Sequence, residues 1–190
     1  MRRRNRTPPP GGPIPRRRGP AGCAPPSPGR PLGSCGATRP AAGLRAFHDA
    51  LPSASCPYSW STEERVTAAA ERHLAAGLMD PASFHVEHRG MSTDRVLAVL
   101  VEPPPVDHAV VCHGDACLPN TLLHDDGRLA GHVDLGRIGV GDRWADLAVA
   151  TWSATWNLGP GWEGELLAAY GVPGDPERSS YYRLLWDASP

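Results

Sequence analysis

Apolar residues recur at three- and four-residue intervals over most of the chain after residue 40, which is the spacing of helices with one buried face. Leu44, Phe47 and Leu51 are an example, and Pro52 ends that run. Capping residues at the start and Gly or Pro at the end mark most of the helical stretches. The predicted helices cover these residue ranges: 41–51, 61–76, 92–102, 142–157, 161–170 and 176–187.

The pattern changes between residues 108 and 136. The stretch "HAVVCHGD" at 108–115 is a short β-branched run, and "NTLLHDDGRLAGHVDLG" at 120–136 contains two apolar runs. Asp125-Asp126-Gly127 joins these two runs and has the composition of a tight turn. The folded part of the chain is therefore predicted to be α+β and mainly helical, with the helices surrounding one β-hairpin.

Three polar residues interrupt the apolar pattern at the ends of this hairpin. Asp115 and Asn120 lie in the loop that enters the first strand, and Asp134 lies where the second strand ends. Because paired strands run about 5 Å apart, the entry and the exit are neighbours, and the three side chains are expected to converge. Carboxylate and amide oxygens at this density suit Mg²⁺. A base Asp, an Asn five residues later and a second Asp also form the catalytic loops of protein kinases, so these residues predict phosphoryl transfer.

A structural interpretation exists for each of these residues on its own. Asp115 could cap a turn, Asn120 could be an ordinary turn residue, and Asp134 could cap the loop that follows it. Any one of them alone would more often be structural than catalytic. The combination of all three around a hairpin of suitable length is what favours a catalytic site.

Charge divides the chain at about residue 45. The first 45 residues hold ten Arg and no acidic residue, whereas the rest holds nine Arg and all 20 acidic residues. Residues 1–43 are also rich in Pro and Gly and poor in bulky apolar residues, so we predict a disordered basic tail there. A nucleic-acid-binding arm is the weaker interpretation, because the tail lacks interleaved aromatic residues. The acidic remainder, residues 44–190, is expected to fold and to attract cationic ligands.

The five Cys residues form no C-x-x-C pair, and without a secretory signal the default is reduced thiols in a cytosolic protein. Cys112, His113 and Cys117 offer a zinc alternative, but their spacing fits no common zinc pattern and a fourth ligand is not evident. No apolar run approaches the roughly 20 residues that a membrane helix needs. We therefore expect a cytoplasmic protein without a membrane partner.

The segment "VVCHGDACLPNTLL…DGRLAGHVDLGRIGVGDRWADLAVA" at 110–150 resembles the C-terminal lobe of the aminoglycoside 3'-phosphotransferases, the kanamycin kinases. Shorter segments such as "LRAFHDALPSASCPYSW" and "YYRLL" follow that family's order as well. The resemblance covers about residues 44–187 and is most specific over 112–146. It implies a protein-kinase-like C-terminal lobe that transfers the γ-phosphoryl group of ATP to an aminoglycoside hydroxyl.

The same resemblance implies a role for individual residues. Asp115 would be the catalytic base, and Asn120 and Asp134 would be the ligands of Mg²⁺. Four further residues are implied as substrate-binding or supporting: Glu87, which would face the amines of the drug, Arg137, which would add positive charge, His113 and Asp187.

The sequence also departs from this family. No Lys occurs in the 190 residues, and neither a Gly-rich phosphate loop nor a β-rich segment precedes residue 44, so the nucleotide-binding N-terminal lobe is expected to be missing. Trp152 stands where family members commonly have Arg, although its helical spacing with Leu147 and Ala148 also fits a core residue. Two functions remain open: an aminoglycoside kinase, or a non-catalytic remnant that keeps the drug and Mg²⁺ sites without an ATP-binding lobe.

Overall fold

A computed structural model of the chain describes residues 36–74 and 79–189. Most of the predicted tail therefore lies outside the described residues, as does Gly77, the predicted end of the second helix. Helix α1 (Thr38–Ala50) begins before Leu44, so the expected boundary between tail and folded lobe falls inside a helix. Pro40 is compatible with this earlier start because it lies in the first helical turn, where its missing N–H breaks no intrahelical hydrogen bond.

The remaining helices follow the predicted order, and their starts show why. The side chains of Ser61, Ser92 and Asp175 each accept a hydrogen bond from the backbone N–H three residues later, which satisfies a donor that the helix leaves free. Among the described residues no helix is both long and apolar enough to cross a bilayer. The helices after α1 are α2 (Thr62–Leu74), α3 (Thr93–Leu100), α4 (Trp144–Leu158), α5 (Glu163–Tyr170) and α6 (Pro176–Ala188), with short 3₁₀ turns at Ser53–Ser55, Pro81–Ser83 and Leu118–Asn120.

The described strands form two antiparallel pairs, of which the sequence predicts one. Strand β2 (Thr121–Leu123) pairs with β3 (Leu129–His132), which confirms the hairpin and its turn. Strand β1 (Ala109–Cys112) pairs with β4 (Gly139–Asp142), a second pair of strands that encloses the hairpin and that the sequence does not predict. The Gly-Val-Gly-Asp sequence of β4 has no alternation of apolar and polar residues that would indicate a strand.

The two Gly residues of β4 let another part of the backbone approach. Ser59 forms a bridge with Val140, and the N–H of Trp60 donates to the Val140 carbonyl at 2.8 Å. A Cβ at Gly139 would lie 2.5 Å from the carbonyl carbon of Ser59, and one at Gly141 would lie 2.5 Å from the Trp60 oxygen. A side chain at either position would therefore push the two segments apart.

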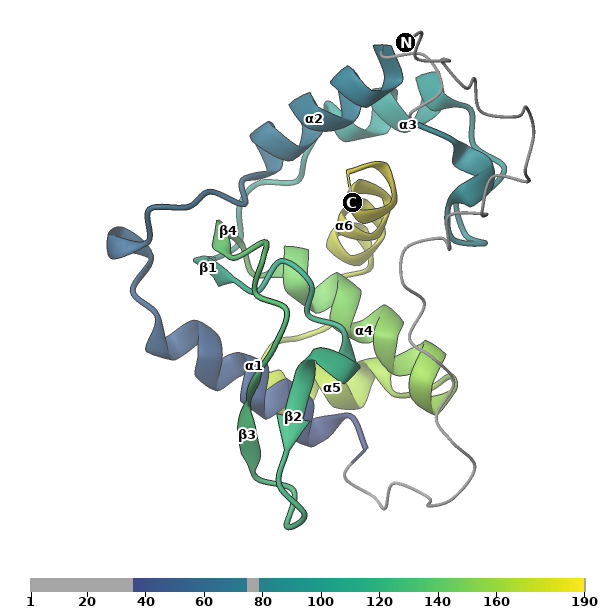
Figure 1. Cartoon of the computed structure of the whole chain (residues 1–190). Helices are drawn as coiled ribbons and strands as arrows, with labels where there is room; N and C mark the ends of the chain where they lie inside the picture. The colour runs from purple at the N-terminus through teal and green to yellow at the C-terminus, as the bar shows by residue number, and fades with distance from the viewer. Residues whose placement is uncertain (1–35, 75–78, 190) are drawn as a thin grey trace, which may run out of the picture.

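This strand pairing positions the two polar loops. Residues 113–120 leave β1 and enter β2, while residues 133–138 leave β3 and enter β4. Because β1 pairs with β4 and β2 pairs with β3, both loops lie at the junction between the two pairs. Figure 1 shows the β2–β3 hairpin extending from this junction away from α6.

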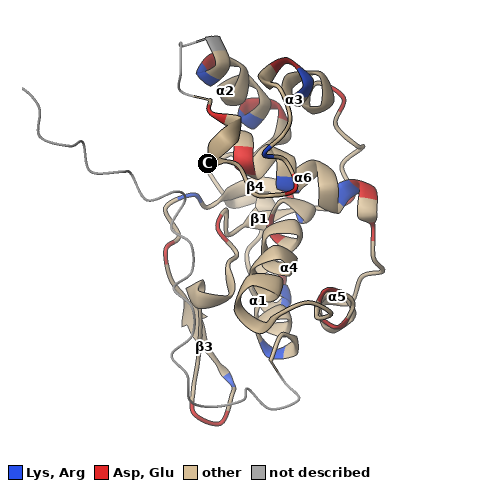
Figure 2. Ribbon diagram, turned by 90° about the vertical axis from the view of Figure 1, so that its right-hand side faces the viewer, with Lys and Arg blue, Asp and Glu red and all other residues tan. Residues whose placement is uncertain are grey.

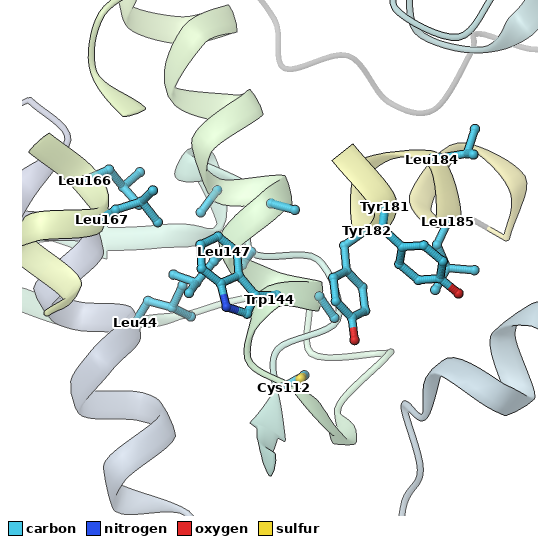
Figure 3. Packing of buried hydrophobic residues seen from close by; sticks show 14 of the residues in the cluster. Leu44, Cys112, Trp144, Leu147, Leu166, Leu167, Tyr181, Tyr182, Leu184 and Leu185 are labelled. Atoms are coloured by element: carbon cyan, nitrogen blue, oxygen red, sulfur yellow. The ribbon is translucent and has the colours of Figure 1, made fainter. Parts of the chain in front are cut away.

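Helix α4 forms the centre of the core, with α6 packed on one side and α5 on the other. Residues 144–154 are all buried, so the amphipathic pattern predicted for 142–157 is wrong over most of the helix. Packing on more than one side is the physical reason. Figure 3 shows Trp144 and Leu147 of α4 among core side chains from α1, α5 and α6. The helix appears almost entirely uncharged in Figure 2, and its one charged residue is Asp146.

Candidate active site

The two polar loops pack directly on each other at Gly114. This residue has φ +81°, and a Cβ added to it would lie 2.3 Å from the carbonyl oxygen of Arg137. The N–H of Val133 also donates to the carbonyl of Asn120 at 3.0 Å, which joins the same loops a second time. The expected convergence of the hairpin entry and exit is therefore present in the backbone.

Asp115 and Asn120 are held as a pair. The N–H of Asp115 donates to Nδ1 of His113 at 3.2 Å, and its carbonyl accepts from Nδ2 of Asn120 at 2.9 Å. Oδ1 of Asp115 is buried and has no hydrogen-bond partner among the described residues. A buried carboxylate oxygen without a partner is rare in a folded protein and indicates a functional role for this side chain.

Asp134 has a strained backbone and an unused carboxylate. Its φ of 62° is the only positive φ of a non-Gly residue in the described part of the chain. The side chain is exposed, and within that part it makes no hydrogen bond or ion pair. Residues held in the left-handed region cost free energy and are found more often at functional sites.

The loop of Asp115 is anchored to helix α4 by a buried carboxylate, that of Asp146, which the sequence analysis does not identify. Asp146 on α4 accepts the backbone N–H of His113 at 2.6 Å and that of Gly114 at 3.0 Å. Nε2 of His48 on α1 lies 3.0 Å from the same carboxylate, and Nδ1 of His48 lies 2.7 Å from the hydroxyl of Tyr170. The available signal was a single acidic residue inside the apolar run "WADLAVA".

The surroundings of Asp146 keep it charged. Burial is the largest single effect and would raise the pKa of this carboxyl, but the hydrogen bond and charge of His48 act against it. The N–H groups of His113 and Gly114 act in the same direction, and the resulting pKa of Asp146 lies below its ordinary value. The charged carboxylate therefore ties α1, α4 and the loop 113–120 together.

His113 supports the loop from inside the protein. Its ring is fully buried, and it lies 6.0 Å from the ring of Phe47 and 5.7 Å from that of His132, measured between centroids. Nδ1 accepts the N–H of Asp115, whereas Nε2 is buried without a partner among the described residues. Of the two roles expected for His113, the packing favours support over contact with a substrate.

The resemblance implies Mg²⁺, and the residues present fit this ion. Asn120 uses its amide nitrogen on Asp115, and among residues 36–74 and 79–189 neither its amide oxygen nor the carboxylate of Asp134 has a hydrogen-bond partner. Mg²⁺ takes one or two protein oxygens and completes its shell with water and phosphate. The zinc alternative has no such support, because the described residues contain no cluster of three or more His, Cys, Asp or Glu able to hold a metal.

Two of the residues expected near the substrate, Arg137 and Glu87, are connected through the side chains of Trp186 and Trp152. The guanidinium carbon of Arg137 lies 5.3 Å from the centre of the Trp186 ring near the end of α6. Glu87 is half-exposed, and its Oε1 accepts a hydrogen bond of 3.1 Å from the indole N–H of Trp152. Trp152 and Trp186 belong to one apolar cluster, so the loop of Arg137 and the turn of Glu87 flank the same group of aromatic side chains.

Asp187 has a different environment from Glu87. Its side chain is only 5% exposed, and Oδ2 lies 2.6 Å from Nδ1 of His88. Both carboxylate oxygens also accept the backbone N–H of His85, at 3.2 and 3.3 Å. Asp187 thus holds the turn that carries Glu87, and a contact between Asp187 and a drug stays a prediction.

One Gly-rich stretch has the letters of a nucleotide loop without the structural setting. "GPGWEG" at 159–164 matches G-x-G-x-x-G, but it joins α4 to α5 and follows no strand. A phosphate-binding loop of this type connects a strand to a helix or a second strand. This stretch is therefore not a candidate nucleotide site.

Comparison with known proteins places the chain in a family. Residues 36–182 match the phosphotransferase enzyme family, and the chain belongs to it. An aminoglycoside 3'-phosphotransferase of Streptomyces fradiae is 39% identical over 150 residues, which are 74% of this chain and 54% of that protein. Streptomycin 3''-kinase of Streptomyces griseus is 35% identical over 151 residues, or 73% of this chain and 55% of the relative. The chain spans about half the length of these relatives.

Solved structures show the same likeness. The crystal structure of an aminoglycoside-3'-phosphotransferase of type VIII superimposes with a TM-score of 0.70 at 32% identity, over 80% of this chain and 60% of that one. Aminoglycoside phosphotransferase APH(3'')-Id from Streptomyces rimosus gives a TM-score of 0.69 at 33% identity, over 81% of this chain and 62% of that one. The fold is thus that of the aminoglycoside phosphotransferases, which is the kinase-like fold that the sequence predicts.

Proposed function

We propose that this chain carries the catalytic and drug-binding half of an aminoglycoside O-phosphotransferase, a kinase-like C-terminal lobe built around its β-hairpin. The observation that supports the proposal is that Asp115 and Asn120, joined by a hydrogen bond, lie on a loop that packs on the loop of Asp134, whose carboxylate has no partner among the described residues. Membership of the phosphotransferase enzyme family supports the same reaction class. A relative that has been solved in complex with ADP and streptomycin supports the two kinds of ligand.

Asp115 is the general base of the proposed reaction. Its carboxylate accepts the proton of a sugar hydroxyl, whose oxygen then forms a bond to the γ-phosphorus of ATP while the bond from that phosphorus to ADP breaks. The amide of Asn120 fixes the backbone of Asp115, and the buried carboxylate of Asp146 fixes the two residues before it. Positioning of this kind supplies much of the rate in phosphoryl transfer.

Asn120 and Asp134 are the proposed ligands of Mg²⁺. When bound, the ion neutralises charge that develops on the phosphate oxygens. Asp134 is held in its strained conformation with an exposed carboxylate, and the amide oxygen of Asn120 is not used by the fold. Both side chains therefore have oxygen atoms to offer without loss of existing contacts.

The charge of the folded part fits a cationic substrate. After residue 45 the chain has nine Arg and 20 acidic residues, and Glu87 presents one of these carboxylates close to the aromatic cluster. An excess of negative charge raises the local concentration of a polycation such as an aminoglycoside. The proposed substrate is thus an aminoglycoside that carries several amines or guanidino groups.

Transfer of labelled γ-phosphate from ATP to kanamycin or streptomycin by the purified chain, in the presence of Mg²⁺, tests this function. Asp115→Asn keeps the size of the side chain and is expected to abolish transfer, whereas Asp125→Asn on the exposed hairpin turn is the matched control and should transfer normally. Drug binding without transfer by the wild type would favour the second function, a non-catalytic remnant. Transfer that survives in Asp115→Asn would exclude Asp115 as the base.

A further inference from the structure

An aromatic surface lies next to Glu87, and the proposed reaction does not account for it. His85, Trp152 and Trp156, here called the aromatic face, are in mutual contact, with ring centroids 4.4 Å apart for His85 and Trp152 and 5.3 Å apart for the two Trp rings. His85 and Trp156 are 5.5 Å apart, and the indole N–H of Trp156 donates to Nε2 of His85 at 3.1 Å. The three rings therefore have fixed relative positions.

The members of the aromatic face differ in exposure. Trp152 is 2% exposed and forms the base, which confirms the core position expected from its helical spacing. Trp156, one helical turn further along α4, is 40% exposed, and the Glu87 side chain is 46% exposed. Both lie next to His85, whose Nδ1 is 4.0 Å from Oε1 of Glu87 and whose ring contacts Trp156. The exposed indole leaves apolar area uncovered, and the carboxylate places negative charge near it.

The position of Glu87 is set by the same group of residues. The indole N–H of Trp152 donates to its carboxylate, and the guanidinium carbon of Arg183 lies 5.5 Å from the centre of the Trp152 ring. Asp187 holds the backbone of His85 at the start of the turn. An indole and a carboxylate held in this way lose little conformational entropy when a ligand binds.

Contacts connect the aromatic face to the proposed catalytic loops. Cys117, two residues after Asp115, packs on the apolar cluster that contains Trp152 and Trp186. Arg137, three residues after Asp134, lies over the ring of Trp186. A substrate that is bound at the catalytic loops could thus extend over this cluster toward Trp156.

We propose that Trp156 and Glu87 form a subsite for one cationic ring of the aminoglycoside. The apolar face of that ring lies on the indole, and its ammonium or guanidinium nitrogen lies between the π-system of Trp156 and the carboxylate of Glu87. His85 is a positioning residue, because it fixes the indole through the N–H bond of Trp156. This subsite rests on the proposed function and adds to it the aromatic contact that selects which ring binds away from the reacting hydroxyl.

Calorimetric titration of the whole chain with kanamycin and with streptomycin, without ATP, tests the subsite. Trp156→Ala is expected to weaken binding by roughly 3- to 30-fold, the range of a cation–π contact, whereas Trp156→Phe stays within about threefold of the wild type. Trp156→Leu keeps apolar bulk without a ring and should weaken binding as Trp156→Ala does. Val86→Ala is the matched control, because Val86 lies on the same turn and is 70% exposed.

The outcomes separate the subsite from the proposed function. A wild type that binds either drug, with Trp156→Ala and Trp156→Leu binding equally well, overturns the subsite alone. Binding that depends on Trp156 without any phosphate transfer supports the subsite and counts against the catalytic proposal. A larger loss for streptomycin than for kanamycin assigns the subsite to a guanidinium group, and an equal loss assigns it to any cationic ring. A wild type that binds neither drug overturns both proposals.

Discussion

The carboxylate of Asp146 lies 2.6 Å from the backbone nitrogen of His113 and thereby links the core helix α4 to the loop of the proposed base. The same carboxylate accepts the N–H of Gly114 and contacts His48. Asp146→Asn keeps the shape of the side chain but replaces one carboxylate oxygen with an NH₂ group. That group cannot accept a hydrogen bond, so one of the backbone N–H groups or His48 loses its acceptor. We expect a loss of about 2–4 kcal/mol in the free energy of unfolding, measured with urea.

An exposed carboxylate provides the control for this change. Asp49 is 59% exposed in a pair with Arg45 on α1, so Asp49→Asn should change the free energy of unfolding by less than about 0.5 kcal/mol. If Asp146→Asn were as small in effect as Asp49→Asn, the anchoring role of Asp146 would be wrong.

Asp146 also predicts how stability depends on pH. Because the pKa of Asp146 in the folded protein lies below its ordinary value of 3.8, its stabilisation is complete above that value. The stabilisation is lost as the pH falls through the folded pKa. Urea unfolding between about pH 5 and pH 2.5 should therefore show a steeper loss of stability in the wild type than in Asp146→Asn.

Other carboxyls do not disturb that comparison. The pKa of Asp107 is also lowered: burial is the largest single effect and raises it, but hydrogen bonds from Arg143 and Trp144 and the charges of Arg143 and Arg178 together outweigh burial. This group contributes equally to both proteins and cancels in the difference between them. Parallel curves for the wild type and Asp146→Asn would show that Asp146 is not charged by its surroundings in the way described.

Gly139 and Gly136 lie close together in the chain but differ in surroundings. A Cβ at Gly139 would lie 2.5 Å from the backbone of Ser59, whereas a Cβ at Gly136 would meet no atom of the described residues within 4 Å beyond its chain neighbours. Gly139→Ala should lower the free energy of unfolding by about 1–3 kcal/mol. Gly136→Ala should leave it unchanged or raise it by up to about 1 kcal/mol. Thermal unfolding of the two variants side by side measures the difference, and equal stability would contradict the close approach of the two segments.

Local signals in the sequence predict those parts of the fold that local chemistry determines. The capping residues Ser61, Ser92 and Asp175 and the hairpin turn at 125–127 are of this kind. Strand β4 depends instead on the distant backbone of Ser59, which no pattern within "GVGD" reveals.

The candidate site divides in the same way. The spacing of Asp115, Asn120 and Asp134 predicts the proposed chemistry, because these residues flank one hairpin. The anchoring role of Asp146 becomes evident only from the burial of α4 on several sides, because a buried carboxylate needs hydrogen-bonding partners. Trp156 gives no sequence signal, since its contact with His85 joins residues 71 positions apart.

Substitutions at Asp134 can separate the effect of its carboxylate on phosphate transfer from the effect of its strained backbone on stability. Asp134→Gly relieves the left-handed conformation, and Asp134→Ala does not, so the alanine variant should be less stable than the glycine variant by about 1 kcal/mol. Both variants lack the carboxylate and should lose phosphate transfer alike. Thermal unfolding and transfer assays on the same preparations provide the measurement, and an alanine variant as stable as the glycine variant would speak against the strain.

Arg65 on α2 is a buried charge without a hydrogen-bonding partner in the described part of the chain. Its Nε, Nη1 and Nη2 are all unpaired there, and its guanidinium carbon lies 4.5 Å from the centre of the Trp60 ring. Burial lowers the pKa of Arg65 to about 10 from its ordinary 12.5, so the group is still charged at neutral pH and its cost of desolvation is present in full.

An apolar side chain of similar length should therefore suit this position better. We expect Arg65→Met to raise the free energy of unfolding at pH 7 by about 1–3 kcal/mol, because it removes an uncompensated buried charge and keeps contact with Trp60. Arg95→Met on the exposed surface of α3 is the matched control and should change stability by less than about 0.5 kcal/mol. A decrease in stability for Arg65→Met, measured by urea unfolding, would mean that the cation–π contact with Trp60 outweighs the burial of the charge.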